Sequence, residues 1–337
     1  MNICMVMASR GNGGLEKHVR ELASELVRQG HDVTIAAPAA FLASLPANIG
    51  RMPIPAHLGR YHPWLLLKLL LALRRGGYDL VHAQASKAAS LVNQLRPWLA
   101  LPTLATLHNI KRDVRLYARF DHIIAVSRQL AASLPREKTS VVYNGIDAPE
   151  APMLDIRQHF ALPADYPVLV AVGRLVHAKG FDLLLEAVDG LPLALLIVGD
   201  GPEHARLTKR VQGMNPTTRC MLTRHRDDAP SLMRSADAVM ICSRREGFSY
   251  VCNEALLLGA RVLSTDVPVA NEVLPPDFIV PTGDVASLRS RLCHWLNRPA
   301  EWAVLQQPAR EFAAQQFTLP VMVTNTLTVY RRLIDHA

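Results

Sequence analysis

The chain has 337 residues, of which 50% are hydrophobic and 20% are charged, and its formal net charge is +8. This composition excludes a disordered or collagen-like chain, and the length favours two domains. The five cysteines are an odd number, which argues against a disulfide framework and favours a reducing compartment. The apolar start of the chain is too short for a signal core, and no run of about 20 apolar residues exists. We therefore expect a cytoplasmic protein without a membrane span.

The positive charge is confined to the first half of the chain. Residues 1–150 contain 18 Lys and Arg against 10 Asp and Glu, whereas residues 151–337 contain 19 of each. A one-sided basic surface attracts an anionic partner such as a membrane, a polyphosphate or a nucleic acid, although solubility alone explains it equally well. Aromatic residues are only 6% and no recognition-helix pattern is present, so we expect no nucleic-acid partner.

Strands and helices alternate from the start of the chain. A continuous apolar run predicts a strand buried on both faces, and the helix after its glycine-rich loop has apolar residues at helical spacing. In chain order we expect strand 3–8, loop 10–14, helix 15–28, strand 33–37, helix 65–75 and strands 80–82, 104–107, 122–126 and 140–143. Leucines surround helix 65–75 almost completely, so we expect this helix to be buried. The alternative is that a basic amphipathic face of residues 64–75 contacts anionic lipid or a phosphorylated saccharide.

A second alternation follows a proline-rich linker at Pro149–Pro152. We expect strands at 168–172, 193–198, 238–241 and 261–264, with helices at 181–188 and 252–258. Two such alternations predict an α/β chain of two doubly wound, Rossmann-like domains, residues 1–150 and 151–319. Ligand is then expected between them, at the carboxyl ends of strands and near helix N-termini.

Two loops between a strand and a helix suit a phosphate. Gly11–Gly14 exposes backbone N–H groups at the start of a helix, although a tight turn explains the glycines equally well. Arg174 and Lys179 lie in the second loop, residues 173–180. Two such cations can neutralise a diphosphate, and the alternative is that both are exposed loop residues without a ligand.

The segment Arg244–Glu254 is the most specific one. Glu246 lies in a glycine-containing loop and Glu254 on the following helix, about 12 Å apart at helical rise. That separation exceeds what a glycosidase pair requires and suits an extended ligand with one carboxylate at each end. The N–H groups of Phe248 and Ser249 are available to a phosphate in the same loop.

Together these segments resemble the GT-B-fold glycosyltransferases of family 4, which are retaining and use nucleotide sugars. The matching motifs lie in order along nearly the whole chain: Gly13–Glu16, Thr106–Asn109, Ala125–Ser127, Val142–Asp147, Gly173–Arg174, Lys179–Gly180, Val198–Pro202 and the Glu246/Glu254 pair. The resemblance implies two lobes facing a central cleft and a helix at about residues 320–337 that packs back on the first domain.

The resemblance also implies a role for each site residue. Glu246, His108, Arg174 and Lys179 would be the catalytic residues; Gly14, Arg174, Lys179, Glu246, Phe248, Ser249 and Glu254 would bind the donor. Arg174 and Lys179 would hold the diphosphate, Glu246 the hydroxyls of the transferred sugar, Glu254 the ribose, Gly14 the donor phosphates or the acceptor, and His108 would lie beside the sugar.

The implied reaction moves a sugar from a nucleoside-diphosphate sugar, with UDP favoured over GDP, to a saccharide or lipid-linked acceptor. No metal and no cofactor are expected, because fixed cations and amides stabilise the leaving diphosphate. Bacterial lipopolysaccharide or surface polysaccharide synthesis is the expected pathway, with peripheral contact to the inner membrane face through the basic first half. A nucleotide-sugar epimerase of the same fold and a non-catalytic nucleotide-sugar-binding subunit are the alternatives.

The chain departs from the family pattern after its strand at 261–264. The family commonly has a glycine-rich turn there, whereas this chain has the bulkier residues 265–271, Thr-Asp-Val-Pro-Val-Ala-Asn. We expect the shape of the donor or acceptor site to differ near this segment.

Overall fold

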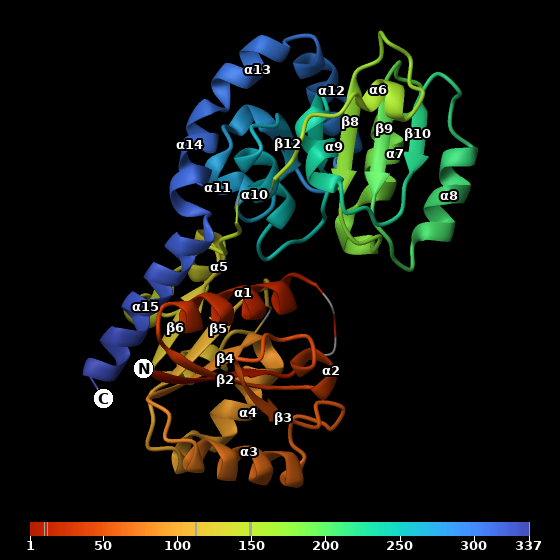
Figure 1. The fold of residues 1–337 in the computed structure, drawn as a ribbon. Helices are drawn as coiled ribbons and strands as arrows, with labels where there is room; N and C mark the ends of the chain where they lie inside the picture. The colour runs from red at the N-terminus through yellow and green to blue at the C-terminus, as the bar shows by residue number, and fades with distance from the viewer. Residues whose placement is uncertain (10, 12, 112, 148–149, 337) are drawn as a thin grey trace. The chain divides into compact units, whose positions relative to one another are not determined.

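The computed structural model describes residues 1–9, 11, 13–111, 113–147 and 150–336. The chain forms two compact units: unit 1 comprises Met1–Gly145 and Gln316–Ala337, and unit 2 comprises Ile146–Gln315. Each unit is an α/β structure with helices on both faces of a sheet (Figure 1). Arg10 and Asn12 of the expected glycine-rich loop, and Pro149 of the expected linker, lie outside the described residues.

Unit 1 is built on a seven-stranded sheet with the order β3-β2-β1-β4-β5-β6-β7, in which all neighbouring strands are parallel. The strands are β1 (Asn2–Met7), β2 (Asp32–Ala37), β3 (Gly50–Pro53), β4 (Leu80–Gln84), β5 (Thr103–Leu107), β6 (His122–Ala125) and β7 (Thr139–Val141). The strand order reverses between β1 and β4. In open α/β sheets this reversal is where ligands bind, at the carboxyl ends of the strands.

Helices cover both faces of this sheet (Figure 1). They are α1 (Gly14–Arg28), α2 (Ala39–Leu42), α3 (Pro63–Arg75), α4 (Ala85–Leu95), α5 (Arg128–Ala131) and α15 (Leu319–Asp335), with short 3₁₀ turns η1 (Arg96–Trp98), η2 (Tyr117–Arg119) and η3 (Arg136–Lys138). Helices α1 and α15 contact each other on one face, and α4 covers the other. Residues from the two ends of unit 1's sequence therefore share one core.

The apolar stripe of α1 explains how it packs. Its side chains at helical spacing, including Val19, Leu22 and Leu26, are buried in one core cluster with Met5 of β1 and Met322 of α15. Burying apolar surface is the main favourable term in folding. The α15 segment thus completes the core that the first helix and first strand begin.

Helix α3 is not buried as expected. It packs on α4 through Leu65, Leu69 and Leu73, which are fully buried, while Leu67 and Leu71 are exposed. The expectation of burial was wrong because leucines occupy both faces of this helix and α4 covers only one of them. An outer layer with apolar side chains facing away from the protein results.

Unit 2 contains a six-stranded parallel sheet with the order β10-β9-β8-β11-β12-β13. Its strands are β8 (Val168–Val172), β9 (Ala194–Val198), β10 (Arg219–Leu222), β11 (Ala238–Ile241), β12 (Val262–Thr265) and β13 (Ile279–Val280). The order reverses between β8 and β11, which repeats the arrangement of unit 1. The predicted α/β class with two doubly wound sheets is confirmed.

The helices of unit 2 also lie on both sides of its sheet (Figure 1). They are α6 (Ile156–His159), α7 (Phe181–Val188), α8 (His204–Gln212), α9 (Ala229–Ser235), α10 (Tyr250–Leu257), α11 (Ala270–Val273), α12 (Val285–Leu296), α13 (Pro299–Leu305) and α14 (Gln307–Gln316), with turns η4 (His177–Lys179) and η5 (Pro276–Phe278). Among the described residues, no helix of either unit combines the length and apolarity that crossing a bilayer requires.

Candidate active site

The loops at the carboxyl ends of β8 and β11 meet at the point where the strand order of unit 2 reverses. The loop after β8 covers residues 173–180, and the loop after β11 covers residues 242–249. The Arg244 N–H donates to the carbonyl of Ala178 at 2.8 Å, which joins the two loops directly. The two segments that the sequence singled out in unit 2 therefore form one surface, at the usual ligand-binding edge of such a sheet.

Close backbone contacts explain the glycines of this surface. Gly180 has φ +67°, and a Cβ there would lie 2.0 Å from the carbonyl oxygen of Cys242. Gly199, after β9, has φ +146°, and its Cβ would lie 2.0 Å from the carbonyl oxygen of Gly173. Only glycine fits at either position. A side chain at Gly180 would separate the loops after β8 and β11, and one at Gly199 would separate the loops after β8 and β9.

Lys179 and Glu246 form an ion pair where the two loops join. Lys179 Nζ lies 2.5 Å from Glu246 Oε1, and the two side chains are 24% and 10% exposed. The Ser243 hydroxyl donates to the same carboxylate oxygen at 2.7 Å. The resemblance assigns the two residues to different parts of one donor, and the structure places their side chains in contact. A cation that suits a phosphate and a carboxylate that suits hydroxyl groups therefore lie next to each other.

Arg244 clamps this surface to α7, a role that the sequence analysis did not assign. Its guanidinium donates to both carboxylate oxygens of Asp182, at 2.7 and 2.9 Å, and to the carbonyl of His177 at 3.0 Å. Burial alone would raise the pKa of Asp182, but the hydrogen bonds and charge of Arg244 hold it below its usual range. The clamp fixes the loop that carries Lys179. Because Asp182 is distant in sequence, no local pattern marks the pair.

Ser249 caps α10, the helix that follows Glu246. Its hydroxyl accepts the N–H of Cys252 at 3.4 Å, and both Phe248 and Ser249 are buried. The first N–H groups of a helix have no partner within the helix, and the helix dipole favours a negative charge beside them. Glu254 lies further along α10 and is half-buried. The expected amide donors and both glutamates therefore belong to one loop and one helix.

Arg174 is the expected site residue with the most freedom. It is exposed, and it makes no ion pair with any residue in the part of the chain that the structure describes. Its guanidinium can therefore turn toward an anion without breaking an existing contact. Lys179, by contrast, must exchange Glu246 for a new partner.

The cavity beside the ion pair is small. The cavity that Lys179, Ser243 and Glu246 line has a volume of only about 10 Å³, which is room for roughly one water molecule. A ligand larger than water must therefore lie on the loops. Cys242 also lines this cavity, and burial raises the pKa of its thiol to about 12, so it is not a thiolate nucleophile.

The loop after β12 contains a strained residue. Val269 has φ +76°, which is a backbone conformation that a β-branched residue rarely adopts, and its side chain is fully buried. This position falls within residues 265–271, where the family commonly has glycine. Val269 therefore adopts the positive φ that glycine favours and adds a buried side chain at this position.

In unit 1, His108 follows β5 and lies in a buried polar cluster. Its Nε2–H donates to Gln84 Oε1 at 2.8 Å, and its ring packs edge-on against the ring of His18, with the centroids 4.8 Å apart. Burial, followed by the neighbouring histidines, holds the pKa of His108 well below its usual value. The imidazole is therefore neutral at physiological pH, with Gln84 fixing which nitrogen carries the proton.

A second buried histidine, His82, extends this cluster to α15. Its ring nitrogens lie 2.7 Å from the Tyr330 hydroxyl and 2.6 Å from the Thr106 hydroxyl. The sequence motifs did not single out His18, His82 or Gln84. For His82 and Gln84 the available signal was their position within the otherwise apolar strand β4, because buried polar groups need partners.

The glycine-rich loop of unit 1 is capped by its own helix. The Gly13 N–H donates to Glu16 Oε2 at 2.9 Å, and Glu16 is almost fully buried. Gly14 is the first residue of α1. A carboxylate thus already lies at the helix N-terminus, where the sequence pattern suggested a phosphate. An anionic ligand at Gly14 would have to lie beside Glu16.

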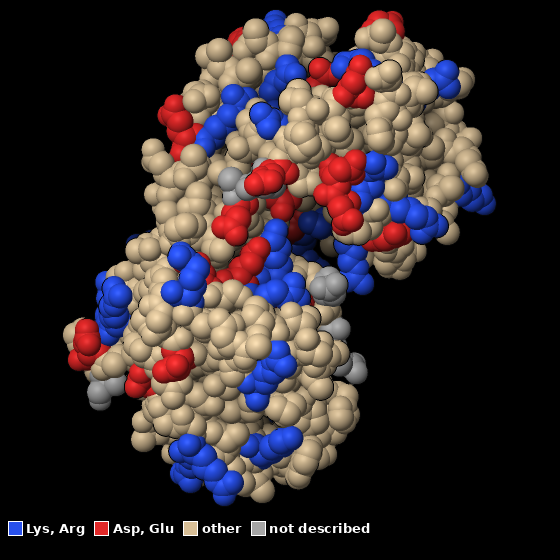
Figure 2. Space-filling view, viewed as in Figure 1, with Lys and Arg blue, Asp and Glu red and all other residues tan. Residues whose placement is uncertain are grey.

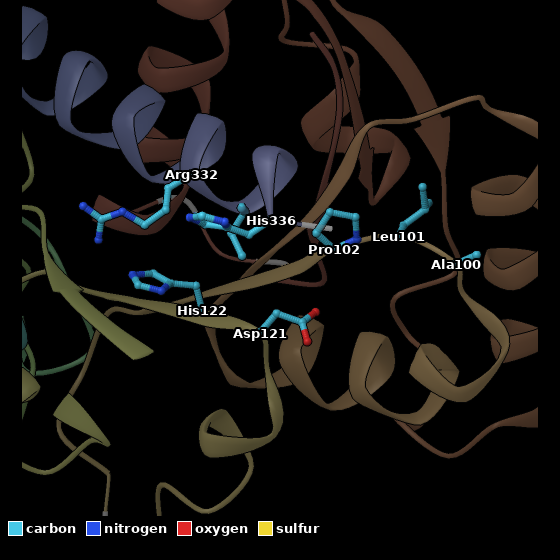
Figure 3. A pocket seen from close by; sticks show the side chains of 8 residues that line it. Ala100, Leu101, Pro102, Asp121, His122, Arg332 and His336 are labelled. Carbon is cyan, nitrogen blue, oxygen red and sulfur yellow. The ribbon is translucent and has the colours of Figure 1, made fainter. Parts of the chain in front are cut away.

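A pocket of about 590 Å³ lies at the opposite edge of unit 1. It is lined by Asp121 and His122, at the amino end of β6, and by Arg332 and His336, at the end of α15, and the Asp121 carboxylate points away from Arg332 (Figure 3). Ligands of doubly wound sheets bind at the carboxyl ends of the strands, so this pocket does not belong to the candidate site. In the described part of the chain, no group of three or more His, Cys, Asp or Glu residues is placed to hold a metal ion.

Comparisons with known proteins agree with this arrangement. The family profile described as "Glycosyltransferase Family 4" matches residues 12–149, and the profile "Glycosyl transferases group 1" matches residues 153–312. The chain is 28% identical to the phosphatidyl-myo-inositol mannosyltransferase of Mycobacterium leprae, over 83% of each chain. It is 24% identical to the O-antigen biosynthesis glycosyltransferase WclY of Escherichia coli, over 64% of this chain and 62% of that protein.

The fold matches that of a solved glycosyltransferase structure. The crystal structure of Anabaena Alr3699/HepE in complex with UDP superposes with a TM-score of 0.83 at 24% identity, covering 98% of this chain and 100% of that chain. At this identity the likeness shows the fold alone.

Proposed function

Because the chain belongs to the family 4 glycosyltransferases with the GT-B fold, we propose that it moves a sugar from a nucleoside-diphosphate sugar to a saccharide or lipid-linked acceptor, with retention of configuration. The observation that carries this proposal is the Lys179–Glu246 pair at the strand reversal of unit 2. One residue suits a diphosphate and the other suits sugar hydroxyls. Sugar and diphosphate are adjacent parts of such a donor.

In the proposed reaction, the bond between C1 of the sugar and the β-phosphate oxygen breaks. The acceptor hydroxyl forms its bond to C1 on the same face, and its proton passes to the leaving phosphate. Arg174, Lys179 and the N–H groups of residues 248 and 249 stabilise the negative charge that grows on the diphosphate. Glu246 and Glu254 hold the hydroxyls of the transferred sugar and of the ribose. No cofactor and no metal takes part, and turnover in excess chelator tests this.

We propose that His108 lies beside the transferred sugar, as the resemblance implies. Because burial and its histidine neighbours keep the imidazole neutral, it would act as a hydrogen-bonding group rather than as an acid. Gln84 holds the ring in one orientation. We therefore expect His108→Ala to lower turnover and Gln84→Leu to lower it less.

The relatives support a more specific assignment. UDP is bound by the Anabaena structure, and the M. leprae relative is named for a lipid acceptor. The E. coli relative is named for O-antigen synthesis. We propose a UDP-sugar donor, with a GDP-sugar as second choice, and a role in bacterial lipopolysaccharide or surface polysaccharide synthesis. Such acceptors place the enzyme in the cytoplasm, at the inner face of the membrane.

The direct test measures release of nucleoside diphosphate from a panel of UDP- and GDP-sugars, with and without saccharide acceptors. Replacing Lys179 or Glu246 by Ala should lower turnover by about 100-fold or more, because each removes charge stabilisation from the transition state. Lys209→Ala and Glu186→Ala, which change exposed helix residues of the same unit, are the matched controls. Near-normal turnover of both site variants would refute the assignment.

Two other functions give different products. A nucleotide-sugar epimerase of this fold converts the donor without any acceptor, so product analysis of donor alone identifies it. A non-catalytic binding subunit releases no nucleotide but is stabilised by UDP; a ligand at 100 times its dissociation constant adds about 2.7 kcal/mol. Nuclear magnetic resonance of the product's anomeric proton distinguishes retention from inversion.

A further inference from the structure

Helix α3 presents an apolar and basic face away from unit 1. Leu65, Leu69 and Leu73 pack inward against α4. On the opposite side, Trp64 is 53% and Leu67 55% exposed. An amphipathic helix packs on its protein through one apolar stripe, which in α3 is the buried one. The exposed apolar side chains on the other side of α3 are therefore not needed for packing within unit 1.

Two neighbouring aromatic residues extend this face. Tyr61, just before α3, is 71% exposed, and Trp98 of η1 is 56% exposed. Arg74 Nε donates to the carbonyl of Trp98 at 2.9 Å, which holds η1 against the end of α3. We call the exposed apolar set Tyr61, Trp64, Leu67, Leu71 and Trp98 the α3 surface. It holds five of the eleven strongly exposed large apolar side chains in the described part of the chain.

The charged residues in the stretch that carries α3 are all positive. Arg60, Lys68, Arg74 and Arg75 are exposed in the same stretch, and residues 33–78 contain no Asp or Glu. Lys68 Nζ lies 5.4 Å from the centre of the Trp64 ring, so cation and aromatic ring share the outer face. Figure 2 shows Lys and Arg, and no Asp or Glu, over the end of unit 1 that carries α3, at the bottom of the view.

We propose that the α3 surface binds the surface of an anionic phospholipid bilayer. The helix would lie in the plane of the headgroups, with Leu67 and Leu71 among the upper acyl chains. Tyr and Trp favour the level of the headgroups, and Lys68 and Arg75 would pair with lipid phosphates. The stripe of apolar residues is narrow and bordered by long cationic side chains, which suits a fluid anionic layer better than a shaped protein pocket.

This inference rests on the proposed function for its biological sense, because a lipid-linked acceptor lies at such a bilayer. It assigns the contact of the basic first half to one defined surface, the exposed side of α3 together with Trp98. Binding would be reversible and dependent on ionic strength, since charges separated by more than about 10 Å are screened at 0.1 M salt.

Sedimentation with vesicles tests the proposal. The protein should bind vesicles containing phosphatidylglycerol at low salt, and bind pure phosphatidylcholine vesicles or charged vesicles at high salt at least about tenfold more weakly. The variant Trp64→Ser, Leu67→Ser, Leu71→Ser should lose binding. So should Lys68→Glu, Arg75→Glu, which changes only exposed charges and guards against misfolding of the first variant.

Matched changes elsewhere serve as controls. Val304 and Leu305 of α13 are 71% and 39% exposed, so Val304→Ser, Leu305→Ser removes exposed apolar side chains from unit 2. Lys209→Glu reverses an exposed charge on α8. Both variants should bind vesicles like the wild type.

Tryptophan fluorescence gives a second measurement. The chain has four tryptophans; Trp295 and Trp302 are 3% and 1% exposed, so only Trp64 and Trp98 can enter a bilayer. Emission should shift to shorter wavelength on addition of anionic vesicles, and the shift should shrink in Trp64→Phe. An unchanged spectrum together with absent sedimentation would overturn the proposal.

Three further outcomes would also overturn it: equal binding to neutral vesicles, binding that the α3 variants retain, and a wild-type dimer that the triple serine variant converts to monomer. The last would assign the α3 surface to a second copy of the chain. Donor turnover without vesicles is measured in the same variants and should be unchanged. Failure of glycosyl transfer in the wild type would leave the vesicle result standing, so the two proposals fail separately.

Discussion

Acidification should destabilise unit 1 through its buried histidines. Burial lowers the pKa of His18 to about 4; burial, with the charge of His18, lowers that of His82 to about 3. In the unfolded chain both titrate near 6.5. As the pH falls below 6.5 the unfolded state takes up protons that the folded state excludes, so stability is highest above 6.5 and declines toward the folded pKa values. Integrated from pH 8 to pH 5, each residue costs about 2 kcal/mol of unfolding free energy.

The variant His82→Gln separates this effect from general acid instability. At pH 8 it should lower the unfolding free energy by about 1–3 kcal/mol, because the hydroxyls of Tyr330 and Thr106 lose a buried partner. Between pH 8 and pH 5, however, it should lose about 2 kcal/mol less than the wild type. Urea unfolding at both pH values measures the two quantities.

His57→Gln is the matched control, because His57 is an exposed histidine of the same unit. It should keep the wild-type loss between pH 8 and pH 5. If His82→Gln and the wild type lost the same unfolding free energy over this range, the neutral, buried state of His82 would be refuted.

Two further predictions concern the loops of unit 2. Gly180→Ala should lower its stability by at least about 2 kcal/mol, because the new Cβ meets the Cys242 carbonyl; Gly259→Ala, which also has positive φ but open space around it, should cost only about 1 kcal/mol. Urea unfolding distinguishes the two, and equal losses would contradict the backbone contact. Glu246→Ala should keep or increase affinity for UDP while turnover falls, because Lys179 is released from its ion pair, whereas Lys179→Ala should weaken UDP binding. Calorimetric titration measures both, and equal weakening would contradict the exchange of partners.

Regular elements with strong local signals could be predicted from the sequence. The strand at 168–172 and the helix at 181–188 have the expected bounds, because a buried parallel strand is a short apolar run and the helix has a glycine before it. The loop between them was recognised by its two cations. Both features depend on residues that are neighbours in the sequence.

Contacts between distant residues could not be predicted in the same way. Lys179 and Glu246 are 67 positions apart, and only the reversal of strand order between β8 and β11 brings them together. His82 meets Tyr330 across 248 positions. The burial of α3 was predicted wrongly because which side of a leucine-rich helix is covered depends on a partner that the helix itself does not encode.

The return of α15 to unit 1 has a consequence for how the polypeptide matures on the ribosome. Unit 2 is continuous in sequence, whereas unit 1 draws its core from Met1–Gly145 and from Gln316–Ala337. Synthesis proceeds from the N-terminus at about 5–20 residues per second. About 170 residues of unit 2 are therefore synthesised after the strands of unit 1 and before Met322 and Tyr330, which complete the core of unit 1. The half of the protein that is translated first is therefore the half that reaches its native state last.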